Sequence, residues 1–124
     1  MALKNWVSRY RYKTPPPVLI VSYNDQPVAE LKKENGKFLF RYFPLFHALN
    51  LSPLPGLAPT GEKYTEFNEL PAFFQERLPD TRRPEIRQWI LERQLDESDE
   101  LQMLSQLGAH SITDPFELKL NKAA

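Results

Sequence analysis

Residues 18–42, VLIVSYNDQPVAELKKENGKFLFRY, contain three apolar segments separated by two turn sequences. The first segment is rich in β-branched residues, and the later two alternate apolar and polar positions, as strands do. Asn-Asp-Gln-Pro forms the first turn, and Asn35 and Gly36 tolerate the positive φ that a tight second turn requires. The pattern predicts a three-stranded antiparallel meander with strands at residues 18–23, 28–33 and 37–42.

Two further segments have the apolar spacing of helices. In residues 67–78, Pro71 suits the first helical turn and Pro79 ends the segment. A second helix is predicted to begin near Pro84 and to run to Arg93, with a basic surface supplied by its arginines. The first apolar face comprises Leu70, Phe73, Phe74 and Leu78, and the second comprises Ile86, Trp89 and Ile90 beside Arg93.

A third helix is predicted from Ser98, as its N-cap, to Gly108, as a left-handed C-terminal stop. Residues 116–120 alternate and are expected to add an edge strand. Prolines and glycines forbid a long helix in residues 43–64, where we expect one or two short strands near 49–51. The fold class is therefore α+β, with a small antiparallel sheet covered by about three C-terminal helices.

Composition excludes several functions. The 124 residues suit one domain, and the absence of cysteine removes thiol catalysis and thiolate metal sites. Sixteen basic residues balance sixteen acidic ones, so no overall field attracts nucleic acid. No apolar run approaches the roughly 20 residues that span a bilayer, and no secretory signal is visible, so we expect a cytoplasmic protein without a membrane partner.

Residues 1–17 form a basic, aromatic arm that ends in three prolines. Cations interleaved with aromatic rings suit phosphates or an acidic partner, whereas a simple leader attached to the fold is the alternative. The expected domain then spans residues 18–120, with a tail at 121–124. The arm's cations are Lys4, Arg9, Arg11 and Lys13, and its rings are Trp6, Tyr10 and Tyr12.

A search for catalytic chemistry finds no supporting motif. The four glycines are scattered, so neither type of glycine-rich phosphate loop is present, and no kinase catalytic loop occurs. His47 and His110 are too far apart in sequence to indicate a metal site, and we expect both to be half-buried structural residues. We expect no catalytic residue, metal or cofactor.

Large apolar side chains beside arginines in residues 73–93 form a composition that protein interfaces favour. The alternative is that Phe73, Phe74 and Trp89 belong to the core. Arg82 and Arg83 are harder to assign to a core, and they suit carboxylates or phosphates in bidentate contacts.

The order of several short motifs resembles the N-terminal subdomain of the HipA kinase-like toxins, which also occurs as the free-standing HipS protein of split toxin–antitoxin operons. The resemblance covers about residues 18–118, and Thr81 and Arg82 stand where the family usually continues with glycine. The matching motifs are Asn24-Asp25-Gln26-Pro27-Val28-Ala29-Glu30-Leu31, Gly36-x-Phe38-x-Phe40-x-Tyr42, Leu51-Ser52-x-Leu54, Phe73-Phe74-x-x-x-Leu78-Pro79-Asp80 and Leu104-x-x-Leu107-Gly108.

The resemblance implies a non-enzymatic antitoxin that neutralises a separately encoded HipA-like Ser/Thr kinase toxin. It further implies a DNA-binding HipB-like antitoxin in the same complex. The alternatives are a structural subunit that completes a split kinase without inhibiting it, and nucleic-acid binding through the arm. The partner-binding residues expected from the resemblance are Phe73, Phe74, Leu78, Pro79, Asp80, Thr81, Arg82 and Arg83.

Overall fold

The computed structural model describes residues 17–59, 61, 63–111 and 114–121. The strands are β1 (Val18–Tyr23), β2 (Gln26–Glu34), β3 (Lys37–Tyr42), β4 (Thr65–Phe67) and β5 (Phe116–Asn121). The helices are α2 (Pro44–Ala48), α3 (Ala72–Gln75), α4 (Pro84–Glu92) and α5 (Glu100–Leu107). The strands form one open antiparallel sheet in the order β4-β3-β2-β1-β5, which confirms the predicted α+β class.

The meander forms as the sequence predicts. Each of its two turns places two successive residues at positive φ, Asn24 and Asp25 in the first and Asn35 and Gly36 in the second. Consecutive left-handed residues give a turn whose twist matches that of antiparallel strands. Both hairpins are therefore closed by short-range interactions, independently of the rest of the chain.

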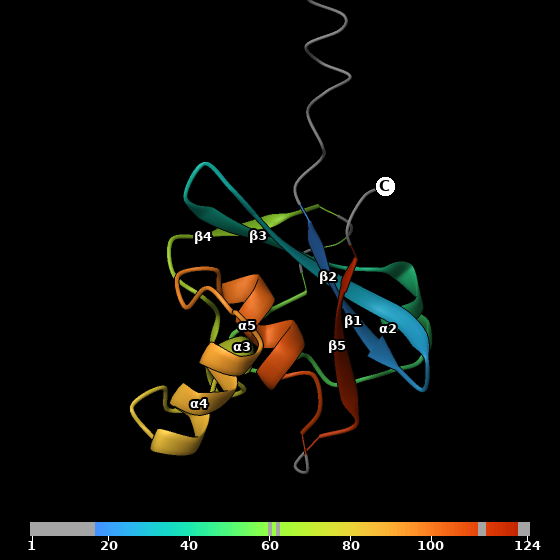
Figure 1. Ribbon diagram of the computed structural model, residues 1–124. Coiled ribbons are helices and arrows are strands. Elements are labelled where there is room, and N and C mark those ends of the chain that lie inside the picture. Colours follow the sequence, from blue (N-terminus) through green and yellow to red (C-terminus); the bar gives the residue numbers. More distant parts are fainter. Residues whose placement is uncertain (1–16, 60, 62, 112–113, 122–124) are drawn as a thin grey trace, which may run out of the picture.

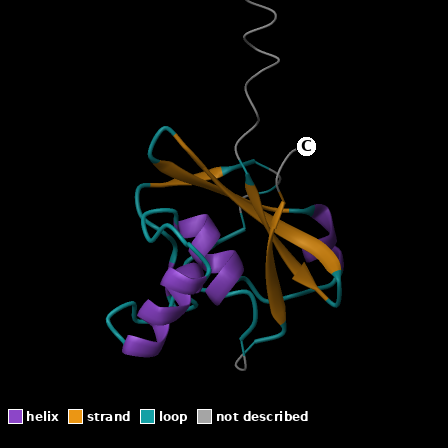
Figure 2. Cartoon of the chain, viewed as in Figure 1, coloured by secondary structure: helices purple, strands orange, loops and turns teal. Residues whose placement is uncertain are grey.

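The core lies between one face of the sheet and the helices. Alternate residues of the strands point into it, including Leu19 and Val21 of β1 and Phe38, Phe40 and Tyr42 of β3, as the period of two predicts. Figure 1 shows α3, α4 and α5 gathered together and α2 apart from them at the right, where it contacts β2 and β3. The helices and strands thus separate into distinct layers (Figure 2).

The predicted C-terminal edge strand is also confirmed. β5 pairs with β1 along its whole length, from Val18 opposite Asn121 to Tyr23 opposite Phe116. Leu118 is buried while Glu117 and Lys119 are exposed, which agrees with the alternation in the sequence. The first and last described strands are therefore neighbours, and the pairing ties the two ends of the domain together.

The prediction of short strands near residues 49–51 is wrong. The chain instead forms α2, with Pro44 in its first turn, and the additional strand is β4. The buried hydroxyl of Tyr42 stabilises the irregular crossing between them, since it donates to the carbonyl of Leu57 at 2.6 Å and accepts from the N–H of Leu54 at 2.8 Å. The crossing is ordered by a side chain of the sheet rather than by strand pairing of its own.

The predicted helix over residues 67–78 is mostly wrong. Phe67 belongs to β4, where it pairs with Phe38, and only the four residues of α3 are helical. Pro71 caps this helix, because the ring of proline fixes φ and restricts the preceding residue. The expected apolar face is nevertheless preserved, since Leu70, Phe73 and Phe74 are buried and Leu78 is partly buried.

The third predicted helix forms as α5, but both predicted caps are wrong. Asp99, not Ser98, is the N-cap, and its side chain accepts from the N–H of Gln102 at 3.2 Å. Gly108 has φ −117°, outside the left-handed region. Glycine is needed there for space, because a Cβ would lie 2.8 Å from the carbonyl oxygen of Arg77.

The second predicted helix, α4, forms close to its predicted bounds and packs through a small cluster of its own. Ile86 and Ile90 meet Met103 of α5 in this cluster, which is separate from the main core. Trp89, for which the sequence left both an interface and a core position open, is 43% exposed. The predicted arm lies outside the described residues apart from Pro17, and β5 ends one residue beyond the expected domain boundary.

Candidate partner-binding surface

Phe73 and Phe74, the first two of the expected binding residues, are buried in the core. They are 4% and 0% exposed, and their rings meet edge to face with centroids 5.0 Å apart. Phe74 also packs edge to face on Phe40, and Phe73 on Phe116. In the free chain these two side chains do not reach the surface, so they act on a partner only by fixing the position of the residues that follow.

The other six expected residues lie together in the connection between α3 and α4. Leu78 is partly buried and contacts both the main core and the α4 cluster. Pro79 and Thr81 are half-buried, whereas Asp80, Arg82 and Arg83 are exposed. The backbone closes into a turn through the N–H of Arg83, which donates to the carbonyl of Asp80 at 3.2 Å. The connection is therefore a fixed turn with polar groups on its outer side.

Asp80 organises the outer side of this turn. Its carboxylate accepts from the side chain of Arg82 at 3.0 and 3.2 Å, and from the backbone N–H of the same residue at 2.9 Å. The side-chain hydrogen bond from Arg82, followed by the backbone one, lowers the pKa of the Asp80 carboxyl. Asp80 consequently stays ionised at neutral pH, and the turn presents a joined carboxylate and guanidinium rather than an isolated positive charge.

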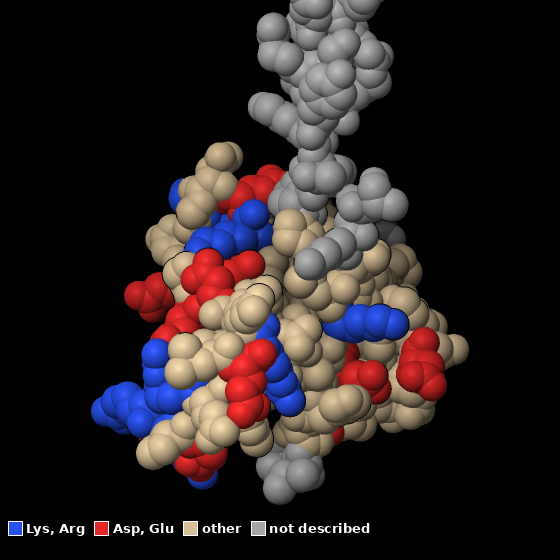
Figure 3. Space-filling model, in the orientation of Figure 1, with Lys and Arg blue, Asp and Glu red and all other residues tan. Residues whose placement is uncertain are grey.

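The expected basic surface of α4 is largely neutralised. Arg83 pairs with Glu85, and Arg87 pairs with Glu97 in the loop after the helix. Blue and red atoms accordingly adjoin over the lower left of the molecule, where α4 lies (Figure 3). A surface of paired charges favours a protein partner with both signs over a polyanion, because its local field is weak.

Two large apolar side chains remain exposed on α4. The sequence left open whether Trp89 is exposed, and it did not single out Leu91. Trp89 is 43% exposed and Leu91 is 70% exposed. The helical spacing places Leu91 away from the face that bears Ile86 and Ile90, so the sequence alone could have indicated that Leu91 is exposed. Trp89 has the spacing of a core residue, and only the packing of α4 against α5 shows that its ring stays at the surface.

Arg77 positions the whole segment, although the sequence did not single it out. Its side chain is 4% exposed, pairs with Asp114 and lies 5.0 Å from the centroid of Phe73. Its guanidinium donates to the carbonyl of Gly108 at 2.8 Å and to that of Phe116 at 2.7 Å. These contacts join the end of α3 to the connection between α5 and β5, so the residues after Arg77 leave the core in a defined direction.

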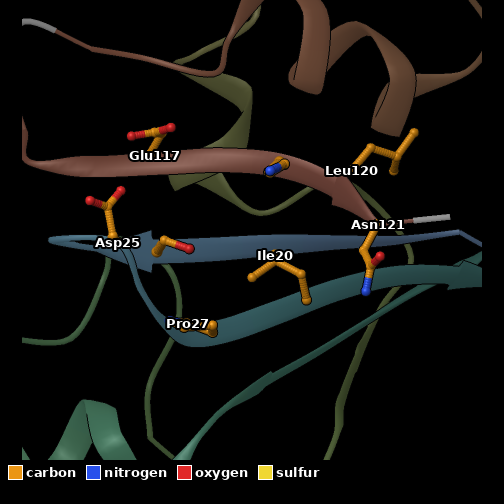
Figure 4. Close-up of a pocket in the computed structure, with 8 residues that line it drawn as sticks. Ile20, Asp25, Pro27, Glu117, Leu120 and Asn121 are labelled. Carbon is orange, nitrogen blue, oxygen red and sulfur yellow. The ribbon is translucent and has the colours of Figure 1, made fainter.

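A separate hollow of about 340 Å³ lies on the sheet over β1 and β5. Figure 4 shows Ile20 between Glu117 and Asp25 at one end and Asn121 at the other. Its lining mixes two carboxylates, one lysine and apolar side chains, and it includes none of the expected binding residues.

The described residues contain no metal site and no membrane-spanning element. No three histidine or acidic side chains among them come close enough to hold a metal ion. His47 and His110 are exposed, in contrast to the half-buried positions that the sequence suggested. No helix within these residues has the length and apolar character that crossing a membrane requires.

The sequence of the chain was compared with curated proteins and with models of protein families. No curated protein sequence matches the chain. The family model of the HipA N-terminal domain matches residues 19–112, a range that contains β1 apart from Val18, β2 to β4 and all four described helices. The matched domain is distinct from the catalytic domain of the HipA kinase. The chain therefore belongs to the HipA N-terminal domain family.

Proposed function

We propose that the chain is a non-catalytic antitoxin that binds a separately encoded HipA-like Ser/Thr kinase in the cytoplasm and suppresses its activity. The observation that carries the proposal is the unpartnered side of α4 that bears Trp89, which stays 43% exposed on the helix that follows the turn at residues 78–83. Membership of the HipA N-terminal domain family supports a HipA-related partner. The absence of kinase motifs from the sequence agrees with a partner that supplies the catalysis.

The proposed contact begins at the exposed part of the turn. Asp80, Arg82 and Arg83 would meet the kinase directly, while Phe73, Phe74 and Leu78 keep the turn in place from below. The Arg82–Asp80 pair is held within the turn, so little side-chain freedom is lost when a partner packs against it. A fixed turn of this kind suits a contact that blocks a substrate or a productive conformation of the kinase.

In this mechanism the chain inhibits the kinase by binding it without a covalent bond, so the inhibition is reversible. Kinase activity then depends on the concentration of the chain relative to the dissociation constant. A DNA-binding HipB-like subunit is the proposed third member of the complex. The second candidate function is a structural subunit that completes a split kinase and leaves it active, and it is favoured by the domain-like size and closed core of the chain.

Charge reversal tests the contact. The double variant R82E/R83E is expected to weaken binding to the proposed HipA-like kinase partner by at least about 10-fold, because it replaces two exposed cations of the turn with carboxylates. The matched control K37E/K119E makes the same charge change on β3 and β5, away from the turn, and is expected to bind as the wild type does. Wild-type affinity in R82E/R83E would move the contact elsewhere.

A phosphorylation assay separates the two candidate functions. The kinase alone and the co-purified complex are compared at equal kinase concentration. Suppressed phosphorylation in the complex supports the antitoxin function, and unchanged or increased phosphorylation supports the structural subunit. Failure of the wild-type chain to co-purify would reject both.

A further inference from the structure

One arginine of α4 differs from its neighbours in what it contacts. Arg82, Arg83 and Arg87 each have a carboxylate partner. Arg93, at the C-terminal end of the helix, has no carboxylate partner among the residues that the structure describes. Its guanidinium reaches the carbonyl of Gln106 at a long 3.4 Å and otherwise lies over an aromatic ring. Arg93 is therefore a positive charge whose strongest class of partner is missing.

The ring beneath Arg93 is that of Trp89. The guanidinium carbon lies 5.5 Å from the ring centroid, within the range of a cation–π contact. The two residues are four positions apart on α4, so their side chains lie one turn apart on the same side of the helix. The contact restricts the rotamers of both side chains before any partner arrives, which reduces the entropy lost on binding.

We propose that Trp89 and Arg93 form the energetic centre of the interface with the kinase, and that the kinase offers an apolar pocket for the indole with a carboxylate at its rim for the guanidinium. The proposal rests on the proposed function and names the chemistry of the surface that the partner must present. Tryptophan and arginine are the residues in which binding energy most often concentrates. In this chain the half-exposed indole of Trp89 contacts the guanidinium of Arg93, which has no carboxylate partner among the described residues.

The position of the pair agrees with the proposed contact at the turn. Trp89 follows Arg83 by six residues, which corresponds to about 9 Å along a helix. A standard interface covers about 800 Å² on each partner, or about 30 Å across, so one interface can include both. Leu91 lies about 160° from Trp89 around the helix and belongs to a different side. It is exposed and on the same helix, so it serves as a matched control.

Affinity measurements with the intact HipA-like kinase proposed as the partner test the proposal. W89A is expected to weaken binding at least about 30-fold and R93A about 10-fold, whereas L91A is expected to stay within about threefold of the wild type. The fold-loss of affinity in the double variant W89A/R93A is expected to be smaller than the product of the fold-losses in W89A and R93A, because the two residues act as one unit. R93K keeps the charge without the planar stack and is expected to fall between wild type and R93A.

The salt dependence gives a second readout. If a carboxylate of the kinase receives Arg93, the affinity of the wild type falls more steeply with ionic strength than that of R93A. Thermal unfolding of each variant identifies any loss of binding that reflects misfolding, and R93K and L91A supply folded references on the same helix.

The outcomes separate this inference from the proposed function. If the wild-type chain binds the kinase and folded W89A and R93A bind equally well, the inference is overturned and the proposed function stands. Equal losses in L91A and W89A would also overturn it, because the binding energy would then be spread over the helix. If the wild-type chain does not bind the kinase at all, both are overturned.

Discussion

The hydroxyl of Tyr42 joins the sheet to the irregular crossing through two buried hydrogen bonds. Burial, only partly offset by the hydrogen bond from Leu54, raises the pKa of Tyr42 to about 12. In the unfolded chain the phenol titrates near 10. The fold favours the neutral phenol, so its contribution is fully present below pH 10 and is lost as the pH rises from 10 to 12.

This shift predicts an alkaline loss of stability that depends on one residue. Between pH 9 and pH 12 the free energy of unfolding of the wild type is expected to fall by about 2 kcal/mol more than that of Y42F. At neutral pH, Y42F is expected to be less stable by about 1–3 kcal/mol, since it leaves the buried N–H of Leu54 without an acceptor. Urea unfolding at several pH values measures both. Parallel pH profiles for the two proteins would contradict the role of Tyr42.

Gly108 gives a second prediction at the scale of one residue. In G108A the new methyl carbon would lie 2.8 Å from the carbonyl oxygen of Arg77 and 3.2 Å from that of Leu104, both backbone atoms that cannot rotate away. The free energy of unfolding is expected to fall by about 1–3 kcal/mol. The exposed Q106A on the same helix is the control and is expected to change it by no more than about 0.5 kcal/mol. Equal stability of G108A and wild type would show that the backbone shifts freely there.

At the scale of elements, the strands and turns that short-range interactions determine were predicted correctly from the sequence. The meander and β5 alternate clearly, and Asn35 and Gly36 close their turn locally. The helix over 67–78 failed because Phe67 gains more by pairing with Phe38 in the sheet than from a helical turn, and no local pattern records that pairing. The cap at Asp99 was missed because Ser98 is an equally good cap by type, and its side chain instead donates to Asp96.

The position of α4 depends on Leu78, which contacts both apolar clusters. L78A is expected to reduce the free energy of unfolding by about 1–3 kcal/mol, because a partly buried leucine is removed between two packed groups. It is also expected to speed amide hydrogen exchange in α4 more than in the sheet, since α4 then contacts the main core only indirectly, through α5. Hydrogen exchange followed by mass spectrometry measures this difference, with L91A as the control. Uniform acceleration across the whole domain would contradict a separate α4 unit.

At the scale of the whole molecule, the sequence located the candidate surface more coarsely than the structure does. Residues 78–83 do form one turn at the surface, but the expected basic character of α4 is largely neutralised because Arg83 and Arg87 pair with carboxylates, and only Arg93 keeps a cation without one among the described residues. Ion pairing between side chains of a turn, a helix and a loop depends on their final positions. The exposure of Trp89 likewise follows from how α4 sits on α5, which periodicity does not encode.

The central claim is that the chain suppresses a HipA-like kinase by reversible occupancy. The most direct measurement follows the phosphorylation rate of the HipA-like kinase proposed as the partner as the chain is added, and again as the complex is diluted. We predict that the rate falls to near zero at equimolar chain and returns when both are diluted below the dissociation constant. A phosphorylation rate that stays constant or rises while the complex demonstrably forms would contradict the claim.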